Sequence, residues 1–287
     1  MRIWEQGLVA TYTVPGYKEM IEEHYRAFAR PGTVIEVHGV KDERSADSAK
    51  VAGKVVNYAY LHRMHDNQIL KNIIRAEKEG FDAVLIGVLQ DPGLHEARSI
   101  VDIPVLGYGE VSMLTALMLG ERFSFVCINP QMEQLVRQMI RERGLEARAA
   151  PTTYLDCGYK DLDDAIQGRP QAFLAAFERA ARKAVDAGVD VMLPGQTLIA
   201  EILWKAGVTR FDDAVVLDPR PPMLRISTSI SAMRSIGGRG SSTTASSKRV
   251  TPAFQRISAM SVWPGSITST PASTALRAAR SNAARKA

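Results

Sequence analysis

The sequence is poor in cysteine and has no long apolar run. Its two cysteines, Cys127 and Cys157, are too few for a disulfide framework or a four-cysteine zinc site. No stretch approaches the roughly 18 apolar residues that a membrane-spanning helix requires, and the N-terminus lacks the basic and apolar segments of a secretory signal. We therefore expect a cytoplasmic protein with two free thiols and no contact with a membrane.

Sequence patterns for nucleotide and metal cofactors are also lacking. Neither G-x-G-x-x-G nor the P-loop occurs. His62 and His65 form an H-x-x-H pair, but a metal site would need a third ligand, such as His38 or Glu110, from a distant part of the chain. We expect no cofactor and no metal. The expected partner is a small-molecule substrate, and a homo-oligomer is left open as an alternative to a monomer.

Acidic residues are absent from the C-terminal part of the chain. Residues 219–287 contain 11 of the 36 Lys and Arg residues and none of the 31 Asp and Glu residues, so they carry +11 against −6 for residues 1–218. Their Ser, Thr, Ala and Arg composition is typical of unfolded segments. The positive charges are scattered rather than clustered, which argues against nucleic-acid binding. We interpret this part as a basic low-complexity tail that is disordered or read in a shifted frame.

Two periodicities alternate in residues 1–218. Short β-rich runs, most of them continuously apolar, are typical of strands buried on both faces, and amphipathic segments between them have helical spacing. The alternation predicts an α/β fold with mainly parallel sheets. The predicted strands are 33–38, 82–88, 103–108, 122–128, 190–195 and 213–218, and the predicted helices are 17–30, 67–80, 130–144 and 170–188.

The strand and helix pattern occurs twice. "AEKEGFDAVLIGV" and "AVDAGVDVMLPGQ" share the order helix, glycine, aspartate, buried strand and glycine, and their aspartates Asp82 and Asp190 are 108 positions apart. This spacing predicts two similar α/β halves rather than a solenoid. We place the first half at 1–111, the second at 112–207, a return segment to the first half at 208–218, and the tail at 219–287.

Polar residues follow the predicted strands where parallel-sheet proteins bind ligands, at the carboxyl ends. "GVLQDPG" places Asp91 as the expected cap of the next helix, with free helix amides that can bind an anionic group. "GYGE" brings Tyr108 and Glu110 to the same edge. "GQTLIAE" offers Gln196, Thr197 and Glu201 in the second half. We expect these residues to line one site.

The segments "DPGLHEARSIVDIPVLGYGE", "RFSFV", "AVDAGVDVMLPG" and "VVLDP" resemble, in order and spacing, the aspartate/glutamate/hydantoin racemase superfamily, most closely its hydantoin and allantoin racemase-like branch. The resemblance covers residues 1–218. It implies two pseudo-symmetric flavodoxin-like halves with an active-site cleft between them, and no cofactor. It also implies a last helix after "LDP" that packs on the first half, but here "RPPMLR" follows, so we expect that helix to be missing or replaced.

Racemisation next to a carbonyl needs a proton-transfer group on each side of the carbon. The resemblance implies that two cysteines supply them, yet their positions here hold Val88 and Gln196. Valine carries no proton, and an amide is not a base. Cys127, late in an apolar strand, is expected to be core packing, whereas Cys157 lies in a polar loop that could approach the cleft. Ordinary two-thiol racemisation is therefore not expected.

Other residues have to replace the thiols. The catalytic candidates are Glu110, His38, His62 and His65, because histidine titrates near neutral pH, although His62 and His65 fit the solvated side of a helix equally well. We expect His24 and His95 on exposed helix surfaces. The substrate-binding candidates are Gln6, Val88, Asp91, Gly93, Tyr108, Asn129, Gln196 and Thr197.

Three functions remain compatible with these residues. The first is a racemase or epimerase that moves a proton at a carbon next to a carbonyl of an amino-acid-derived compound, such as a hydantoin. The alternative is a lyase or hydrolase on the same fold that decarboxylates its substrate or opens a ring, and the third is a binding protein without catalysis. The polar residues Asp91, Glu110 and Gln196 at the strand ends favour an enzyme.

Overall fold

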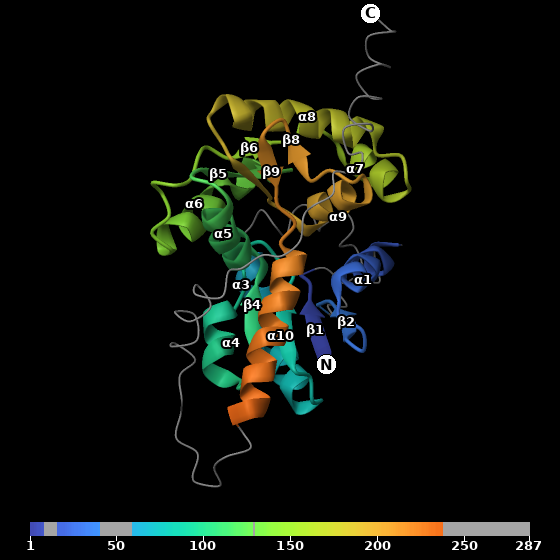
Figure 1. Ribbon diagram of the computed structural model, residues 1–287, viewed down its shortest axis with the longest axis vertical. Helices are drawn as coiled ribbons and strands as arrows, with labels where there is room; N and C mark the ends of the chain where they lie inside the picture. Colours follow the sequence, from blue (N-terminus) through green and yellow to red (C-terminus); the bar gives the residue numbers. More distant parts are fainter. Residues whose placement is uncertain (9–15, 41–58, 129, 238–287) are drawn as a thin grey trace, which may run out of the picture.

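The computed structural model describes residues 1–8, 16–40, 59–128 and 130–237, and these form two α/β halves (Figure 1). The sheet of the first half is parallel, with strand order β2-β1-β3-β4. Its elements are β1 (Arg2–Gln6), α1 (Tyr17–Phe28), β2 (Val34–His38), α3 (Ala59–Lys78), β3 (Ala83–Ile86), α4 (Leu94–Ile100) and β4 (Val105–Gly107).

The second sheet has the order β6-β5-β7-β9-β8 and is parallel except for the β8-β9 pair. The α/β fold with two halves predicted from the sequence is thus confirmed. The second half contains α5 (Tyr108–Leu119), β5 (Phe123–Cys127), η3 (Pro130–Met132), α6 (Glu133–Glu142), β6 (Thr153–Tyr154), α7 (Tyr159–Ile166), α8 (Gln171–Asp186), β7 (Val191–Pro194), α9 (Thr197–Lys205), β8 (Arg210–Phe211) and β9 (Ala214–Val216).

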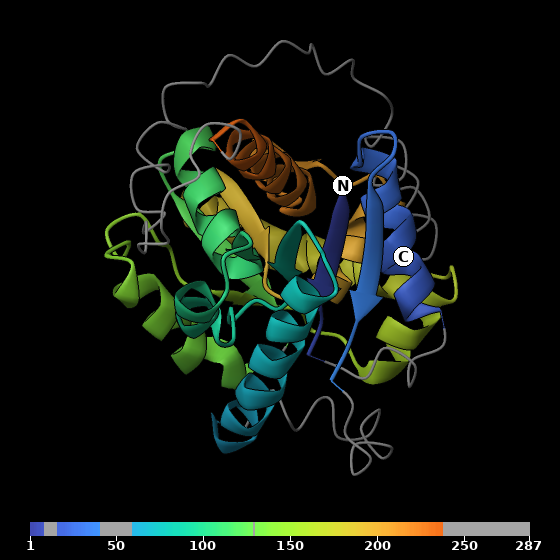
Figure 2. The ribbon, with the colours of Figure 1, turned by 90° about the horizontal axis from the view of Figure 1, so that it is seen from below.

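Alternating side chains bury both faces of the first sheet. Ile3 and Leu85 pack with α1, α5 and the last helix, α10 (Arg220–Gly237), while Trp4 and Val84 pack with α3 and α4. This is the period of two expected of strands covered on both sides. Figure 2 shows α3 and α10 on opposite sides of the sheet. The core on the α10 side continues into the second half through apolar side chains of β5, α6 and β7.

Residues 208–218 were predicted to return to the first half, and this prediction is wrong. Ala214–Val216 form β9, which pairs in parallel with β7, and Arg210–Phe211 form β8, which pairs with β9. Pairing with β7 buries the apolar "AVV" segment inside the second sheet, where its backbone groups also find partners. The chain crosses back to the first half only after β9.

The prediction of a tail from residue 219 is wrong for residues 220–237. These residues form helix α10, which packs against α1, α5, β3 and β4. Pro221 and Pro222 lie in its first turn, where proline is tolerated, and Met223, Leu224 and Ile230 recur at helical spacing and are buried. The last helix implied by the resemblance is therefore present. Residues 238–287 lie outside the described residues.

A substitution in α10 tests this packing. Leu224→Ala should lower the free energy of unfolding by about 2–4 kcal/mol, because it removes a buried side chain and leaves a cavity between α10 and the first sheet. The matched control is Ser229→Ala on the exposed side of the same helix, for which we expect little change. Urea denaturation measures both. Equal stability of the two variants would show that α10 does not pack on the core.

Candidate functional site

The carboxyl ends of the two sheets meet at the centre of the molecule. Tyr108, which follows β4, donates its hydroxyl proton to the carbonyl oxygen of Pro194 at the end of β7, at 3.1 Å. Gln90, two residues after Val88, contacts the sulfur of Met132 at 3.3 Å. The strand ends of the first half therefore touch those of the second. We call the residues at this junction, Val88, Asp91, Tyr108, Gln196 and Thr197, the strand-end site.

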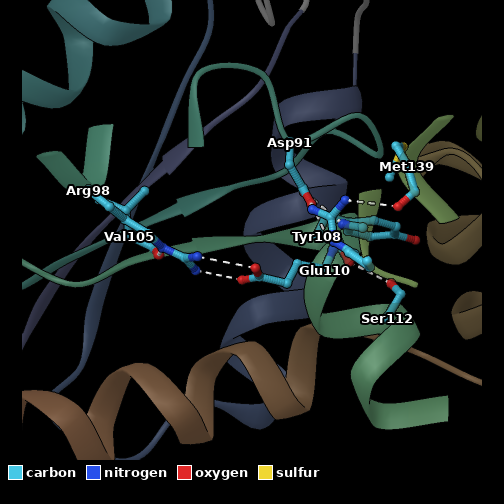
Figure 3. Close-up of polar contacts among 9 residues, drawn as sticks. Asp91, Arg98, Val105, Tyr108, Glu110, Ser112 and Met139 are labelled. Carbon is cyan, nitrogen blue, oxygen red and sulfur yellow. Dashed lines mark hydrogen bonds and ion pairs between the residues drawn. The ribbon is translucent and has the colours of Figure 1, made fainter. Parts of the chain in front are cut away.

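Asp91 has a different role from the one predicted. Its carboxylate accepts hydrogen bonds from the backbone nitrogens of Gly109 (2.8 Å) and Glu110 (2.7 Å), so it caps α5 rather than α4 (Figure 3). The residue preceding α4 is Gly93, which provides no side-chain cap. The left-handed backbone of Asp91, with φ 49°, turns its side chain toward α5. The guanidinium of Arg143, which follows α6, forms an ion pair with the Asp91 carboxylate at 3.1 Å.

Two further features show how closely Asp91 is enclosed. Burial raises its pKa to about 7, although the two backbone N–H groups and Arg143 act in the opposite direction. The first turn of α5 admits only glycine at position 109, because a Cβ there would overlap the carbonyl oxygen of Leu89. Asp91 thus ties the loop after β3 to the start of α5 and to α6.

Glu110, a catalytic candidate, is engaged by an arginine. Its two carboxylate oxygens accept hydrogen bonds from the guanidinium of Arg98 on α4, at 3.1 and 2.5 Å, and Figure 3 shows the carboxylate turned toward Arg98. Arg98 also donates to the carbonyl oxygen of Val105. Because both oxygens are held in a bidentate pair, the carboxylate joins α4 to α5 and is not a free base in this structure.

His38 ends β2, beside the end of β1. Its ring stacks on Trp4, with centroids 3.3 Å apart, and burial lowers its pKa to about 4, so the imidazole is neutral at pH 7. Its Nε2 has no hydrogen-bond partner among the described residues; Glu36 lies 3.9 Å away. Gln6 is fully buried, with its side-chain oxygen bonded to Trp4 and its nitrogen to the Gly7 carbonyl. Both polar atoms of the Gln6 side chain are therefore hydrogen-bonded within the first half.

The other histidine candidates lie in α3. His62 and His65 fall in the first two turns of that helix, but their side chains are outside the described residues, and so is Asn129. In a β-α-β unit the helix runs antiparallel to the strands, so its N-terminus lies near their carboxyl ends. The backbone of α3 therefore carries both histidines toward the same edge of the sheet as His38.

The two positions of the absent thiols lie at equivalent points of the two halves. Val88 follows β3 and is buried among apolar side chains that include those of α3 and α4. Gln196 follows β7 in extended conformation, precedes α9, and accepts a hydrogen bond from the backbone nitrogen of Ile128 at 2.9 Å. Thr197 begins α9, and its Oγ1 lies 2.7 Å from the hydroxyl of Tyr17. Val88 and Gln196 carry no acid or base.

The natural cysteines do not take the place of the absent thiols. Cys127 is fully buried in the core between the halves, as predicted, and burial raises the pKa of its thiol. Its sulfur fills the space beside Gly195, where a Cβ would overlap it. Cys157 is half-buried against the outer core of the second half, and burial raises its pKa as well. Both shifts keep the thiols protonated and unreactive at neutral pH.

Sequence analysis missed a buried charged cluster between the halves, and its expectation of an exposed His24 was wrong. His24 is fully buried, as are Glu5, Glu201 and Arg220. The spacing of apolar residues in α1 offered a signal, because Met20, Ile21 and Tyr25 surround position 24 on the buried side of the helix. His95 is exposed on α4, as expected. Glu5 and Arg220 offered no such signal, since their partners lie far away in the sequence.

The described residues contain neither a cluster of metal ligands nor a membrane-spanning helix. No group of three or more His, Cys, Asp or Glu side chains in this part of the chain is arranged to hold a metal ion. Within the same residues, none of the helices combines the length and apolar character needed to cross a membrane.

Comparison with known proteins gives a family and a fold. The model of the Asp/Glu/Hydantoin racemase family matches residues 8–216. The hydantoin racemase of Pseudomonas sp. (strain NS671) is 28% identical over 156 residues, which are 54% of this chain and 58% of that protein. The chain thus matches less than two thirds of that relative's length.

Two solved structures share the fold. Allantoin racemase from Klebsiella pneumoniae has a TM-score of 0.65 at 23% identity, covering 82% of this chain and 89% of that one. Allantoin racemase from Pseudomonas fluorescens has a TM-score of 0.63 at 21% identity, covering 82% and 92%. The family match extends over most of the chain and includes both strand ends of the site. The chain belongs to the Asp/Glu/Hydantoin racemase family.

Proposed function

We propose that this protein is an isomerase that moves a proton at a carbon next to a carbonyl of an amino-acid-derived compound such as a hydantoin. The observation that carries the proposal is the contact between the carboxyl ends of β4 and β7, made by Tyr108 and Pro194 in a chain of this family. A substrate held between these ends has one half of the protein on each side. This is the arrangement that proton removal on one face and return on the other requires.

The start of α9 fits the carbonyl side of such a substrate. The first backbone N–H groups of a helix have no partner within the helix and attract negative charge. Gln196 and Thr197 add an amide and a hydroxyl at this point. We assign to them the holding of the carbonyl oxygen on which negative charge develops when the proton leaves.

We assign proton transfer on the side of the first half to its histidines, in place of the thiol absent at position 88. His38 is neutral, and its Nε2 is buried without a hydrogen-bond partner among the described residues, although a quarter of the side chain is exposed. It stacks on Trp4, which belongs to the core covered by α3, the helix that also carries His62 and His65. An unperturbed histidine exchanges protons near neutral pH, which favours His62 and His65 over His38, whose pKa burial lowers to about 4. Glu110 is bound by Arg98. This assignment is supported by placement in the fold.

Proton NMR in heavy water tests the proposal. Single enantiomers of substituted hydantoins and allantoin are incubated with the protein, and the signal of the hydrogen on the stereogenic carbon is followed together with optical rotation. We expect enzyme-dependent loss of the signal for at least one compound, with slower loss of rotation, because the histidine candidates all lie on the side of the first half. New product signals without exchange would instead establish a lyase or hydrolase, and the absence of any change would contradict catalysis on this substrate class.

Matched histidine and cysteine variants locate the proton carriers. His38→Gln, His62→Gln and His65→Gln are compared with His95→Gln, which changes an exposed histidine of α4. We expect at least one of the first three to slow exchange by about a hundredfold, the scale of a lost acid or base, and the fourth to change nothing. Cys157→Ser should also leave exchange unchanged. Loss of exchange in that variant without unfolding would overturn the assignment.

A further inference from the structure

His24 links three segments of the chain inside the molecule. Its Nδ1 lies 2.7 Å from a carboxylate oxygen of Glu201 on α9, and its Nε2 lies 2.7 Å from one of Asp218, between β9 and α10. The ring stacks on Trp204 of α9, with centroids 4.1 Å apart and planes inclined by 10°. One side chain of the first half is thus fixed by two carboxylates and an aromatic ring from beyond residue 200.

The two contacts define the protonation state of the ring. Each carboxylate only accepts hydrogen bonds, so a histidine bonded to both must donate from both nitrogens as an imidazolium. Burial lowers the pKa of His24, but the hydrogen bonds with Asp218 and Glu201 outweigh it, and the pKa is raised above its usual value. The two carboxylate contacts and this shift together favour the positively charged ring in the folded structure.

The surrounding charges balance only when His24 is protonated. Arg220 of α10 pairs with Glu201, so two cations face the carboxylates of Glu201 and Asp218. Glu5 of β1 is uncharged at neutral pH because burial raises its pKa to about 8. The hydroxyls of Tyr17 and Tyr25, whose pKa values burial also raises, complete the surroundings and are neutral. Loss of the His24 proton would leave a net negative charge in a buried place.

The same pair of helices meets again at the strand-end site. Tyr17, two turns before His24 on α1, is hydrogen-bonded to Thr197, and Glu201 lies one turn after Thr197 on α9. α1 and α9 are therefore joined at two points, of which the first lies at the start of α9. Because Gln196 and Thr197 lie at the start of α9, the orientation of α9 against α1 determines their positions in the strand-end site.

We propose that His24 is a positioning residue: as an imidazolium between Glu201 and Asp218 it fixes α9 against α1, and thereby places Gln196 and Thr197 at the strand-end site. The inference rests on the proposed function only for the substrate contact that it gives to these two residues. The joint itself concerns the protein without substrate, and it is tested there.

The test compares the full-length protein with His24→Gln and with the control His95→Gln. Hydrogen–deuterium exchange of the amides of residues 199–203 is measured at pH 6.5. We expect His24→Gln to speed their exchange roughly tenfold, the fold-change that corresponds to one lost charged hydrogen bond, and to spare the amides of α3 and α8. The control should match the wild type.

The pH dependence of the melting temperature shows whether His24 acts through its charge or only through its packing. A raised histidine pKa adds stability that is complete below about pH 6.5 and is lost as the pH rises through the folded pKa. The melting temperature of the wild type should therefore exceed that of His24→Gln most at low pH, and the difference should shrink toward pH 9. Glu5 titrates in both proteins and cancels in the comparison. A difference independent of pH would overturn the proposal.

A second variant covers failure of His24→Gln to fold. Tyr17→Phe removes only the hydroxyl that bonds Thr197, and it should speed exchange at the start of α9 alone. Faster exchange spread evenly over α1, α9 and α10 in either variant, or none at all, would overturn the proposal. Because none of these measurements needs substrate, they can fail while hydantoin exchange is observed, or succeed while it is absent.

Discussion

Replacing Asp91 with alanine should lower the free energy of unfolding by about 3–5 kcal/mol, the range for breaking a buried ion pair. The carboxylate accepts from the backbone nitrogens of Gly109 and Glu110 and pairs with Arg143. Alanine leaves all three donors without this partner in a place that water reaches poorly. Urea denaturation at pH 8, where the carboxyl is mostly ionised, measures the loss.

Two controls bracket this result. Asp91→Asn keeps one acceptor oxygen for the start of α5 and should lose roughly half as much stability, since an uncharged partner makes weaker bonds. Asp102→Ala removes an exposed aspartate at the end of α4 and should change stability by less than about 0.5 kcal/mol. Similar stability of Asp91→Ala and Asp102→Ala would show that Asp91 does not hold the strand-end site together.

The general fold could be predicted because its signals are local. Apolar runs such as the one that forms β3 indicate strands buried on both faces, and the amphipathic segments between them indicate helices. Helix α10 could not be predicted from composition, because Ser and Arg dominate the segment. Among the side chains of α10 that the structure describes, the apolar residues Met223, Leu224 and Ile230 are buried, and they suffice once the rest of the fold supplies a surface to cover.

The site could be predicted only in part for a related reason. Parallel topology places residues after each strand at one edge, which is why the sequence predicts Tyr108, Gln196 and Thr197 at the site. The partner of each side chain depends on the other half or on backbone conformation. The φ of Asp91 directs its carboxylate to α5, and Arg98 forms an ion pair with Glu110. His24 is buried by residues almost two hundred positions away in the sequence. The partner in each of these contacts has no signature within a few residues, although the apolar spacing of α1 does indicate that His24 is buried.

Restoring both thiols should produce the largest gain of activity. In the double variant Val88→Cys, Gln196→Cys, we expect exchange and inversion of a hydantoin to accelerate by about 10²–10⁴ over the wild type, the range for a well-placed acid or base. Val88 follows β3 and Gln196 follows β7, and the two halves touch at neighbouring strand ends through Tyr108 and Gln90. The thiol at 196 would precede the N-terminus of α9, which lowers a thiol pKa. NMR and polarimetry follow the two rates.

The single variants explain why both thiols matter. A base on one side alone can exchange the hydrogen with solvent but returns it to the same face, so exchange should outpace inversion in Val88→Cys and in Gln196→Cys. With a thiol on each side the two rates should converge. The matched control is Val88→Ala, Gln196→Ala, which removes the same side chains without adding thiols. If it is as active as the double cysteine variant, the strand-end site does not hold the reacting carbon between these two positions.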